Sequence, residues 1–217
     1  MKSTWKFYSR TTGYTRLFID LIILFFLAPL SILSPFIQLL ISLFFFITLL
    51  LGVNALSFSP KTMGTLRIVA AIAFGADVIV FPWSTQLTDL TSLIANIFQA
   101  IFVFVIIMAI GFRITHEERV NADVIRGGIC LYFLLGIFWF FLYQIVDFFD
   151  PVAFSMPEGT IRANLFYFSF TTLTTVGYGD ISPINIFAMT LANAEALVGQ
   201  IYPAIVIAKL VSLYESD

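Results

Sequence analysis

Two glycines separated by one residue follow a run of threonines in the C-terminal part of the chain. Residues 168–180 read Phe-Ser-Phe-Thr-Thr-Leu-Thr-Thr-Val-Gly-Tyr-Gly-Asp. Glycine adopts backbone dihedrals that other residues resist, so Gly177 and Gly179 allow an extended chain whose carbonyls point one way. Rings of such carbonyls replace the water around an ion inside a membrane pore. We therefore predict an ion-binding segment made of Thr175, Val176, Gly177, Tyr178 and Gly179.

Neighbouring residues must hold this segment in place. The apolar stretch 161–173 is too short to cross a bilayer, and it predicts a re-entrant helix just before the segment. The negative end of that helix dipole would point toward the ion path. The Thr175 hydroxyl would add one oxygen, while Val176 and Tyr178 would point away from the path and pack against aromatic side chains.

The sequence Thr-Val-Gly-Tyr-Gly, preceded by Thr-Thr-x-Thr and followed by Asp, resembles the filter of the potassium channel family in its six-transmembrane, single-pore-loop, prokaryotic-type form. The resemblance covers residues 124–213. It implies that potassium is the permeant ion, bound by Thr175, Val176, Gly177 and Tyr178, and we expect no other cofactor. It also implies a homotetramer, because each chain supplies one filter strand and four strands close the ring.

The same resemblance assigns residues that support the filter. Family members surround it with aromatic side chains of the re-entrant helix, often tryptophans, and Tyr167 and Phe168 occupy that place here. We predict that Tyr167 or a nearby donor hydrogen-bonds Asp180 behind the filter, a contact that would bear on inactivation.

Four residues of the last apolar segment are further candidates. Gly199 lies 20 residues after Gly179 (199 − 179 = 20), where many family members carry a hinge glycine, and Pro203 adds a second candidate kink. Close packing between helices explains Gly199 equally well. Glu195 lies near the middle of the membrane, where it would either titrate or brace the last helix against the re-entrant helix. Gln200 would face the cavity or join that brace.

The composition places the whole chain in a lipid bilayer. Hydrophobic residues make up 60% of the 217 residues and charged residues 11%, with a mean hydropathy of +1.00. Soluble domains are typically about 45–50% apolar and about 25% charged. The single cysteine, Cys130, excludes an intrachain disulfide and a multi-cysteine metal site, and no basic run is typical of nucleic-acid binding.

We predict an all-α membrane protein with six transmembrane helices. Their approximate ranges are 17–33, 36–56, 66–83, 90–112, 124–149 and 184–213. A tight turn at Ser34 and Pro35 separates the first two, and Ser182 and Pro183 would open the last as N-cap and first helical residue.

The basic residues support this count. With a cytoplasmic N-terminus, six crossings place ten of the eleven lysines and arginines inside, and leave only Arg162 outside. The ten are Lys2, Lys6, Arg10, Arg16, Lys61, Arg67, Arg113, Arg119, Arg126 and Lys209. We therefore predict a multi-pass protein of the plasma or inner membrane with both termini cytoplasmic.

The fourth span lacks the charges of a voltage sensor. Residues 90–112 contain no lysine or arginine, whereas each sensor charge contributes about 2.3 kcal/mol per 100 mV. We divide the chain into a voltage-sensor-like domain without sensor arginines (1–112), an interfacial linker (113–126) and a pore domain (127–217).

The outer mouth of the pore domain is predicted to be acidic. Asp147, Asp150, Glu158 and Asp180 oppose Arg162 there. These carboxylates either attract cations to the pore or simply mark the membrane interface.

Together these features predict a non-enzymatic, homotetrameric channel that conducts potassium passively and is not gated by a charged fourth helix. Two other functions remain open. One is a transporter subunit with a filter-like segment, and the other is a non-conducting subunit that regulates related channels.

Overall fold

The computed structural model describes residues 13–55, 64, 67–72, 74–75, 78, 86–116, 121–157 and 161–214. The elements are α2 (Gly13–Leu27), the 3-10 helix η1 (Ala28–Ile32), α3 (Pro35–Ala55), α5 (Gln86–His116), α6 (Ala122–Phe149), β1 (Phe154–Ser155), α7 (Ile161–Leu173), β2 (Ser182–Pro183) and α8 (Ile186–Tyr214). Outside the described residues lie half of the predicted third span (66–83) and the residues Lys2, Lys6, Arg10, Lys61, Arg119 and Glu158.

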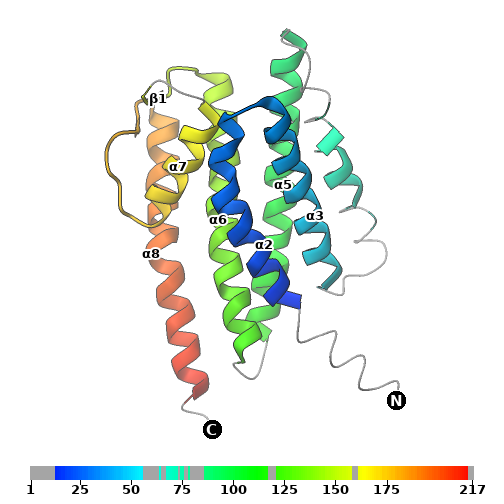
Figure 1. Ribbon diagram of the computed structural model, residues 1–217. Helices are drawn as coiled ribbons and strands as arrows, with labels where there is room; N and C mark the ends of the chain where they lie inside the picture. The colour runs from blue at the N-terminus through cyan, green and yellow to red at the C-terminus, as the bar shows by residue number, and fades with distance from the viewer. Residues whose placement is uncertain are drawn as a thin grey trace.

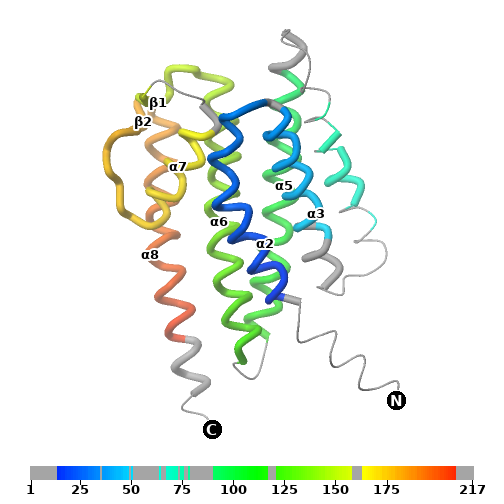
Figure 2. The backbone as a smooth tube through the Cα atoms, in the orientation of Figure 1, coloured from blue at the N-terminus to red at the C-terminus, as the bar shows by residue number. Residues whose placement is uncertain are grey.

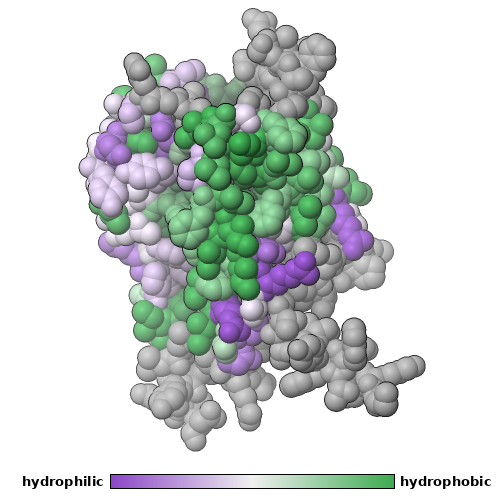
Figure 3. Space-filling view, in the orientation of Figure 1, coloured by the Kyte–Doolittle hydropathy of each residue, from purple (hydrophilic) through white to green (hydrophobic). Residues whose placement is uncertain are grey.

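Four helices in this described part of the chain are long and apolar enough to cross a membrane. They are Tyr14–Ile32, Leu90–His116, Ala122–Phe149 and Ile186–Ala208, whereas the apolar stretch Phe36–Thr48 within α3 is shorter. Hydrophobic side chains cover the face formed by α2 and η1 (Figure 3). The chain is therefore a multi-pass helical membrane protein, and the count of six spans stays a prediction.

Capping side chains define where two of the helices begin. The hydroxyl of Ser34, which precedes Pro35 at the start of α3, accepts a hydrogen bond from the Ile37 amide at 3.2 Å. Asn121 caps α6 in the same way, because its side chain accepts a bond from the Asp123 amide at 3.0 Å. The predicted turn after the first span therefore corresponds to a capped helix start.

The predicted start of the last span is wrong. Ser182 and Pro183 form β2, which pairs antiparallel with β1, and α8 begins at Ile186. The side chain of Asn185 caps α8, accepting a hydrogen bond from the Ala188 amide at 2.7 Å. Ser182 and Pro183 resemble a helix start in sequence, but strand pairing and a second capping residue three positions later decide the outcome.

Both described ends of the predicted interfacial linker (113–126) are helical. Residues 113–116 are the last turn of α5, and residues 122–126 are the first turn of α6. Both turns contact the start of α2: the Arg113 guanidinium lies 5.5 Å from the centre of the Tyr14 ring, and Arg126 donates a hydrogen bond to the Thr15 hydroxyl at 3.0 Å. The division of the chain into domains at these positions stays a prediction.

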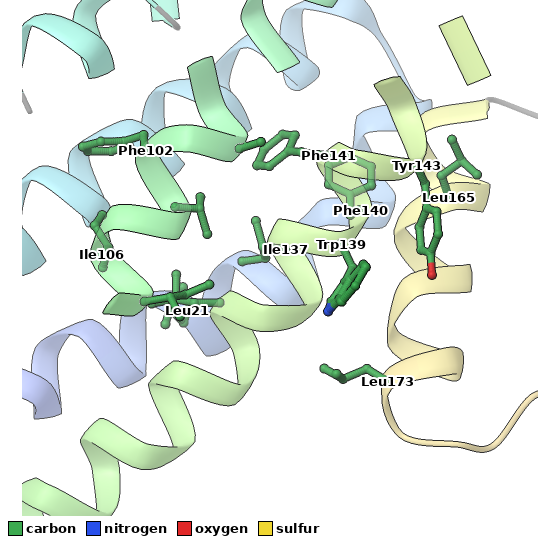
Figure 4. Packing of buried hydrophobic residues seen from close by; sticks show 14 of the residues in the cluster. Leu21, Phe102, Ile106, Ile137, Trp139, Phe140, Phe141, Tyr143, Leu165 and Leu173 are labelled. Carbon is green, nitrogen blue, oxygen red and sulfur yellow. The ribbon is translucent and has the colours of Figure 1, made fainter. Parts of the chain in front are cut away.

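Helix α6 lies at the centre of the bundle, in contact with α2, α5, α7 and α8 (Figure 1). Its buried side chains form one hydrophobic core with those of its neighbours, and Leu21, Ile106 and Ile137 are among them (Figure 4). The first described turn of α2 and the end of α8 lie at the same end of the bundle. Central packing of α6 means that neighbouring helices are positioned through one shared element.

An aromatic cluster joins α2 to α7. The Phe25 ring lies 4.9 Å from Phe170 and 5.9 Å from Phe166, both on α7, and 5.6 Å from Phe133 on α6. Aromatic pairs at such distances contribute about 0.5–1.5 kcal/mol beyond the area that they bury. The N-terminal helix therefore packs directly against the short helix that precedes the predicted filter.

Gly136 of α6 is the position where this cluster leaves no room. A Cβ added there would lie 2.7 Å from the Phe170 ring, which is held among other aromatic rings. We expect Gly136→Ala to lower thermal stability in detergent, because overpacking costs about 1–3 kcal/mol and alanine recovers at most about 1 kcal/mol of helix propensity.

Gly128→Ala in the same helix is the matched control. Its added Cβ would meet the Tyr202 hydroxyl at 3.6 Å, an ordinary contact. Melting temperatures of the two variants, measured side by side, test the packing. Equal melting temperatures would contradict the close approach of α7 to α6.

Candidate ion-conduction site

Helix α7 and the residues after it form a hairpin that enters and leaves at one end of the bundle. The chain descends through α7, leaves it partway through the bundle, and climbs back to β2 beside α8 (Figure 2). We call residues 174–181 the return segment. Helix α7 occupies the residues 161–173 that the sequence indicated.

Left-handed backbone alternates along the return segment. Thr175, Gly177 and Gly179 have φ angles of +57°, +51° and +82°. Glycine adopts this region freely, whereas a threonine there is strained by about 1–3 kcal/mol. Glycine spacing in the sequence indicates two of these positions, and no sequence signal marks Thr175 as the third.

The amides at the start of the return segment bond back to the end of α7. The Thr175 amide donates to the Thr172 carbonyl at 2.9 Å, and the amides of Val176 and Gly177 donate to the Thr171 carbonyl at 2.9 and 3.2 Å. These bonds satisfy carbonyls that a helix end would otherwise leave without partners. The carbonyls of residues 175–178 accept no hydrogen bond from the described residues.

Ile181 at the end of the return segment is buried in the core, but the side chains of Val176 and Tyr178 project away from it. Val176 is 52% exposed and Tyr178 is 73% exposed. The Tyr178 ring lies nearly parallel to Tyr167 of α7, with centres 6.3 Å apart. Burial, a side-chain hydrogen bond with Asp180 and the charge of that carboxylate raise the pKa of Tyr167. The structure therefore brings together Tyr167, Tyr178 and Asp180, and a role for them in supporting a filter stays a prediction.

Phe168 lies on the other side of α7. It is buried, and its ring contacts are with Tyr143 at 5.0 Å and Phe154 at 5.6 Å. Consecutive residues of an α-helix point about 100° apart, so Tyr167 and Phe168 cannot both face the return segment. Phe168 instead packs the hairpin onto α6 and β1.

Two polar contacts and a short strand pair anchor the upper end of the hairpin. Strand β1 pairs with β2, and the Ile184 amide donates to the Ala153 carbonyl at 2.7 Å. The Asp150 carboxylate accepts a hydrogen bond from the Asn185 side chain at 2.7 Å. Asp150, one of the carboxylates predicted at the outer mouth, thus connects the end of α6 to the start of α8.

The lower end of α7 rests on α8 at Gly199. A Cβ added to Gly199 would overlap the Leu173 carbonyl oxygen and lie 2.7 Å from the carbonyl carbon. The same carbonyl accepts a hydrogen bond from the Tyr132 hydroxyl of α6 at 3.1 Å. This geometry favours close packing as the reason for a glycine at position 199.

Pro203 removes a helical hydrogen bond at Gly199. Helix α8 runs without a break from Ile186 to Tyr214 and contains Pro203. Proline has no amide hydrogen, so the Gly199 carbonyl, four residues earlier, loses its helical partner. A hinge at Gly199 stays a prediction, and these two residues would form it together.

Glu195 joins three helices at one buried point. Its side chain is 0% exposed, and its carboxyl oxygens bond with the hydroxyls of Ser169 on α7, at 2.6 Å, and of Tyr143 on α6. The Ser169 hydroxyl also contacts the Gly136 carbonyl at 2.7 Å. Figure 4 shows the Tyr143 ring beside α7. Gln200, the other candidate for a brace, is exposed and lies outside this cluster.

Sequence reasoning missed Ser169 and Tyr143 as partners of Glu195. A buried carboxyl needs hydrogen-bond donors, and both residues are polar groups inside apolar segments. That polarity is the available signal, but helix spacing alone does not say which polar residues meet.

Helix α5 carries basic residues only at its last turn, namely Arg113 and His116. The described helix therefore has no ladder of charges across the membrane, as its sequence indicates.

Residues 127–216 match a protein family described as ion channel. This range begins in α6 and includes α7, the return segment and α8, so the similarity to ion channels covers the hairpin and the helices on either side of it. No solved structure matches the chain.

Two curated relatives are both named protein LctB. The chain is 39% identical to that of Bacillus caldotenax over 62 residues, which are 29% of this chain and 46% of the relative. It is 45% identical to that of Geobacillus stearothermophilus over 51 residues, 24% of this chain and 36% of the relative. The chain thus spans less than half the length of either relative.

Gly199→Ala should disturb the lower end of the hairpin, because the new methyl group would displace backbone rather than a side chain. We expect a larger loss of thermal stability in detergent than the roughly 1–3 kcal/mol of an ordinary overpacked site. Gly111→Ala on α5 is the control, since its added Cβ would meet only a Leu131 methyl carbon, at 3.6 Å. A Gly199→Ala variant as stable as Gly111→Ala would show that α7 does not rest on α8 here.

Proposed function

We propose that the chain is one subunit of a potassium-selective channel and that residues 175–179 form its filter. The observation that carries this proposal is a segment of alternating left-handed backbone whose first amides are bonded and whose carbonyls at residues 175–178 are left for another partner. Non-helical backbone is tolerated at membrane depth only where it is buried in protein or lines a cavity. A dehydrated cation is the partner that such carbonyls suit.

Two further features favour a potassium filter. The motif Thr-Val-Gly-Tyr-Gly stands at the C-terminal end of α7, where the helix dipole is negative and attracts a cation. The Thr175, Val176, Gly177 and Tyr178 carbonyls, with the Thr175 hydroxyl, supply oxygens and no formal charge. Potassium is therefore the transported ion of this proposal.

The proposal includes a homotetramer. One chain contributes one strand of carbonyls, and a ring that surrounds an ion needs several copies. Apolar side chains of the return segment and of α8 lack cover: Val176, Tyr178, Leu197, Ile201 and Ile205 are more than half exposed. Neighbouring subunits around a fourfold axis would cover Val176 and Tyr178 and place α8 along the pore.

We also propose that the channel lies in the plasma or inner membrane with both termini in the cytoplasm. The start of α2 and the end of α8 lie at one end of the bundle, which favours this arrangement. Because α5 lacks a ladder of basic residues, gating by the movement of charges on this helix is not part of the proposal.

Gly177→Ala tests the filter. At a φ of +51°, a side chain adds about 1–2 kcal/mol of strain in each copy, and a distorted ring no longer fits one ion. Potassium and sodium fluxes into liposomes that contain the purified chain should be strongly selective for the wild type. The variant should lose that selectivity, whereas Gly128→Ala should keep it.

The size of the assembly is measured in the same samples. Selective flux from a tetramer is the expected result. A tetramer without flux would favour the regulatory-subunit function, and uptake that requires a coupled ion gradient would favour the transporter.

A further inference from the structure

If Glu195 were ionised, the short oxygen–oxygen contacts around it would outnumber the hydrogens available to bridge them. Three contacts form one chain: Gly136 carbonyl to Ser169 hydroxyl, Ser169 hydroxyl to Glu195, and Glu195 to Tyr143 hydroxyl. Each hydrogen bond needs one hydrogen. The two hydroxyls supply one each, so a carboxylate leaves one of the three contacts without a hydrogen.

A protonated Glu195 supplies the missing hydrogen, so that all three contacts are hydrogen bonds. Its Oε1 then donates to the Ser169 oxygen at 2.6 Å, which frees the Ser169 hydrogen to donate to the Gly136 carbonyl at 2.7 Å. The Tyr143 hydroxyl donates to Oε2. With an ionised Glu195, either the Ser169–Gly136 pair or the Ser169–Glu195 pair would be two acceptors in close contact.

The surroundings also disfavour a charge. Glu195 is 0% exposed and lies in α8, about ten residues into a membrane-spanning helix. The titratable groups that act on it from the described helices are Tyr143 and Tyr132, both on α6, and α7 contributes only the neutral Ser169. No basic side chain acts on it within the described residues. A buried carboxylate without a cation is unfavourable enough to take up a proton.

We propose that Glu195 keeps its proton in the folded protein at neutral pH and, as a carboxylic acid, positions α7 by joining it to α6 and α8. Ionisation leaves the single hydrogen of the Ser169 hydroxyl for two acceptors, so the middle of α7 loses its hydrogen bond to either α6 or α8. The effect on ion selection rests on the proposed function, because α7 ends at the filter. The protonation does not depend on it.

Carbon-13 NMR of the full chain, labelled at the glutamate carboxyl carbons, reads this proton directly. The chain has five glutamates. We expect one carboxyl resonance to stay at the position of a protonated acid at about pH 7, and to be absent in Glu195→Gln. Exposed glutamates ionise near pH 4.3, so five carboxylate resonances at neutral pH would overturn the proposal.

Glu195→Gln tests whether the hydrogen bonds of a neutral side chain, and not only its volume, are needed at this position. The glutamine amide donates to Ser169 and its carbonyl accepts from Tyr143, so this variant should fold and melt close to the wild type, whereas Glu195→Ala should melt lower. Failure of Glu195→Gln to fold would contradict the proposal. Glu195→Asp, which keeps the acid but is one methylene shorter, should also melt below Glu195→Gln.

The pH dependence supplies a second readout. The folded state holds a proton that the unfolded state releases above about pH 4.3, so the unfolded state binds fewer protons and stability falls as the pH rises. For the wild type we expect the folding equilibrium constant to fall up to about tenfold per pH unit more steeply than for Glu195→Gln. Parallel profiles would overturn the assignment, and a non-selective channel that still shows the protonated resonance would contradict only the proposed function.

Discussion

Backbone that leaves a helix inside a bilayer has to satisfy its own polar groups, and this constraint organises the C-terminal half of the chain. Helix α7 stops partway through the bundle, and the return segment begins there. Its first amides bond to carbonyls in the last turns of α7, so helix end and segment satisfy each other. The carbonyls of residues 175–178 remain, and in the proposed function they line a cavity and bind an ion. In the proposed conduction path, a permeant ion is the partner of these carbonyls.

Contacts at three levels hold α7 in the position from which the return segment begins. Below, the Leu173 carbonyl rests against Gly199 and accepts the Tyr132 hydroxyl. In the middle, Glu195, Ser169 and Tyr143 join three helices. Above, strands β1 and β2 pair and Asp150 bonds Asn185. The aromatic side of α7 packs against α2 through Phe25, so the N-terminal helix contributes to the position of the hairpin. Helix α5, without a ladder of charges, contributes packing against α6.

Sequence patterns predict the parts that depend on local chemistry. The range of α7 follows from its length and apolar character, and two of the three left-handed positions follow from glycine. The third, Thr175, lies between two residues whose amides bond back to α7, and its residue type does not reveal the left-handed conformation. The same holds for tertiary partners. Tyr167 and Phe168 are both aromatic, but consecutive residues of a helix point about 100° apart, so Tyr167 contacts the return segment and Phe168 contacts the core. Ser182 and Pro183 resemble a helix start because capping preferences are local, whereas the pairing with β1 that overrides them involves residues far apart in the chain.

The central claim is that carbonyls of the return segment select potassium. The reversal potential of the purified chain in a planar bilayer, with potassium on one side and sodium on the other, tests it most directly. If the return segment selects potassium, the current reverses close to the potassium equilibrium potential. A reversal near zero, with current present, would show that the segment does not select the ion and would contradict the account.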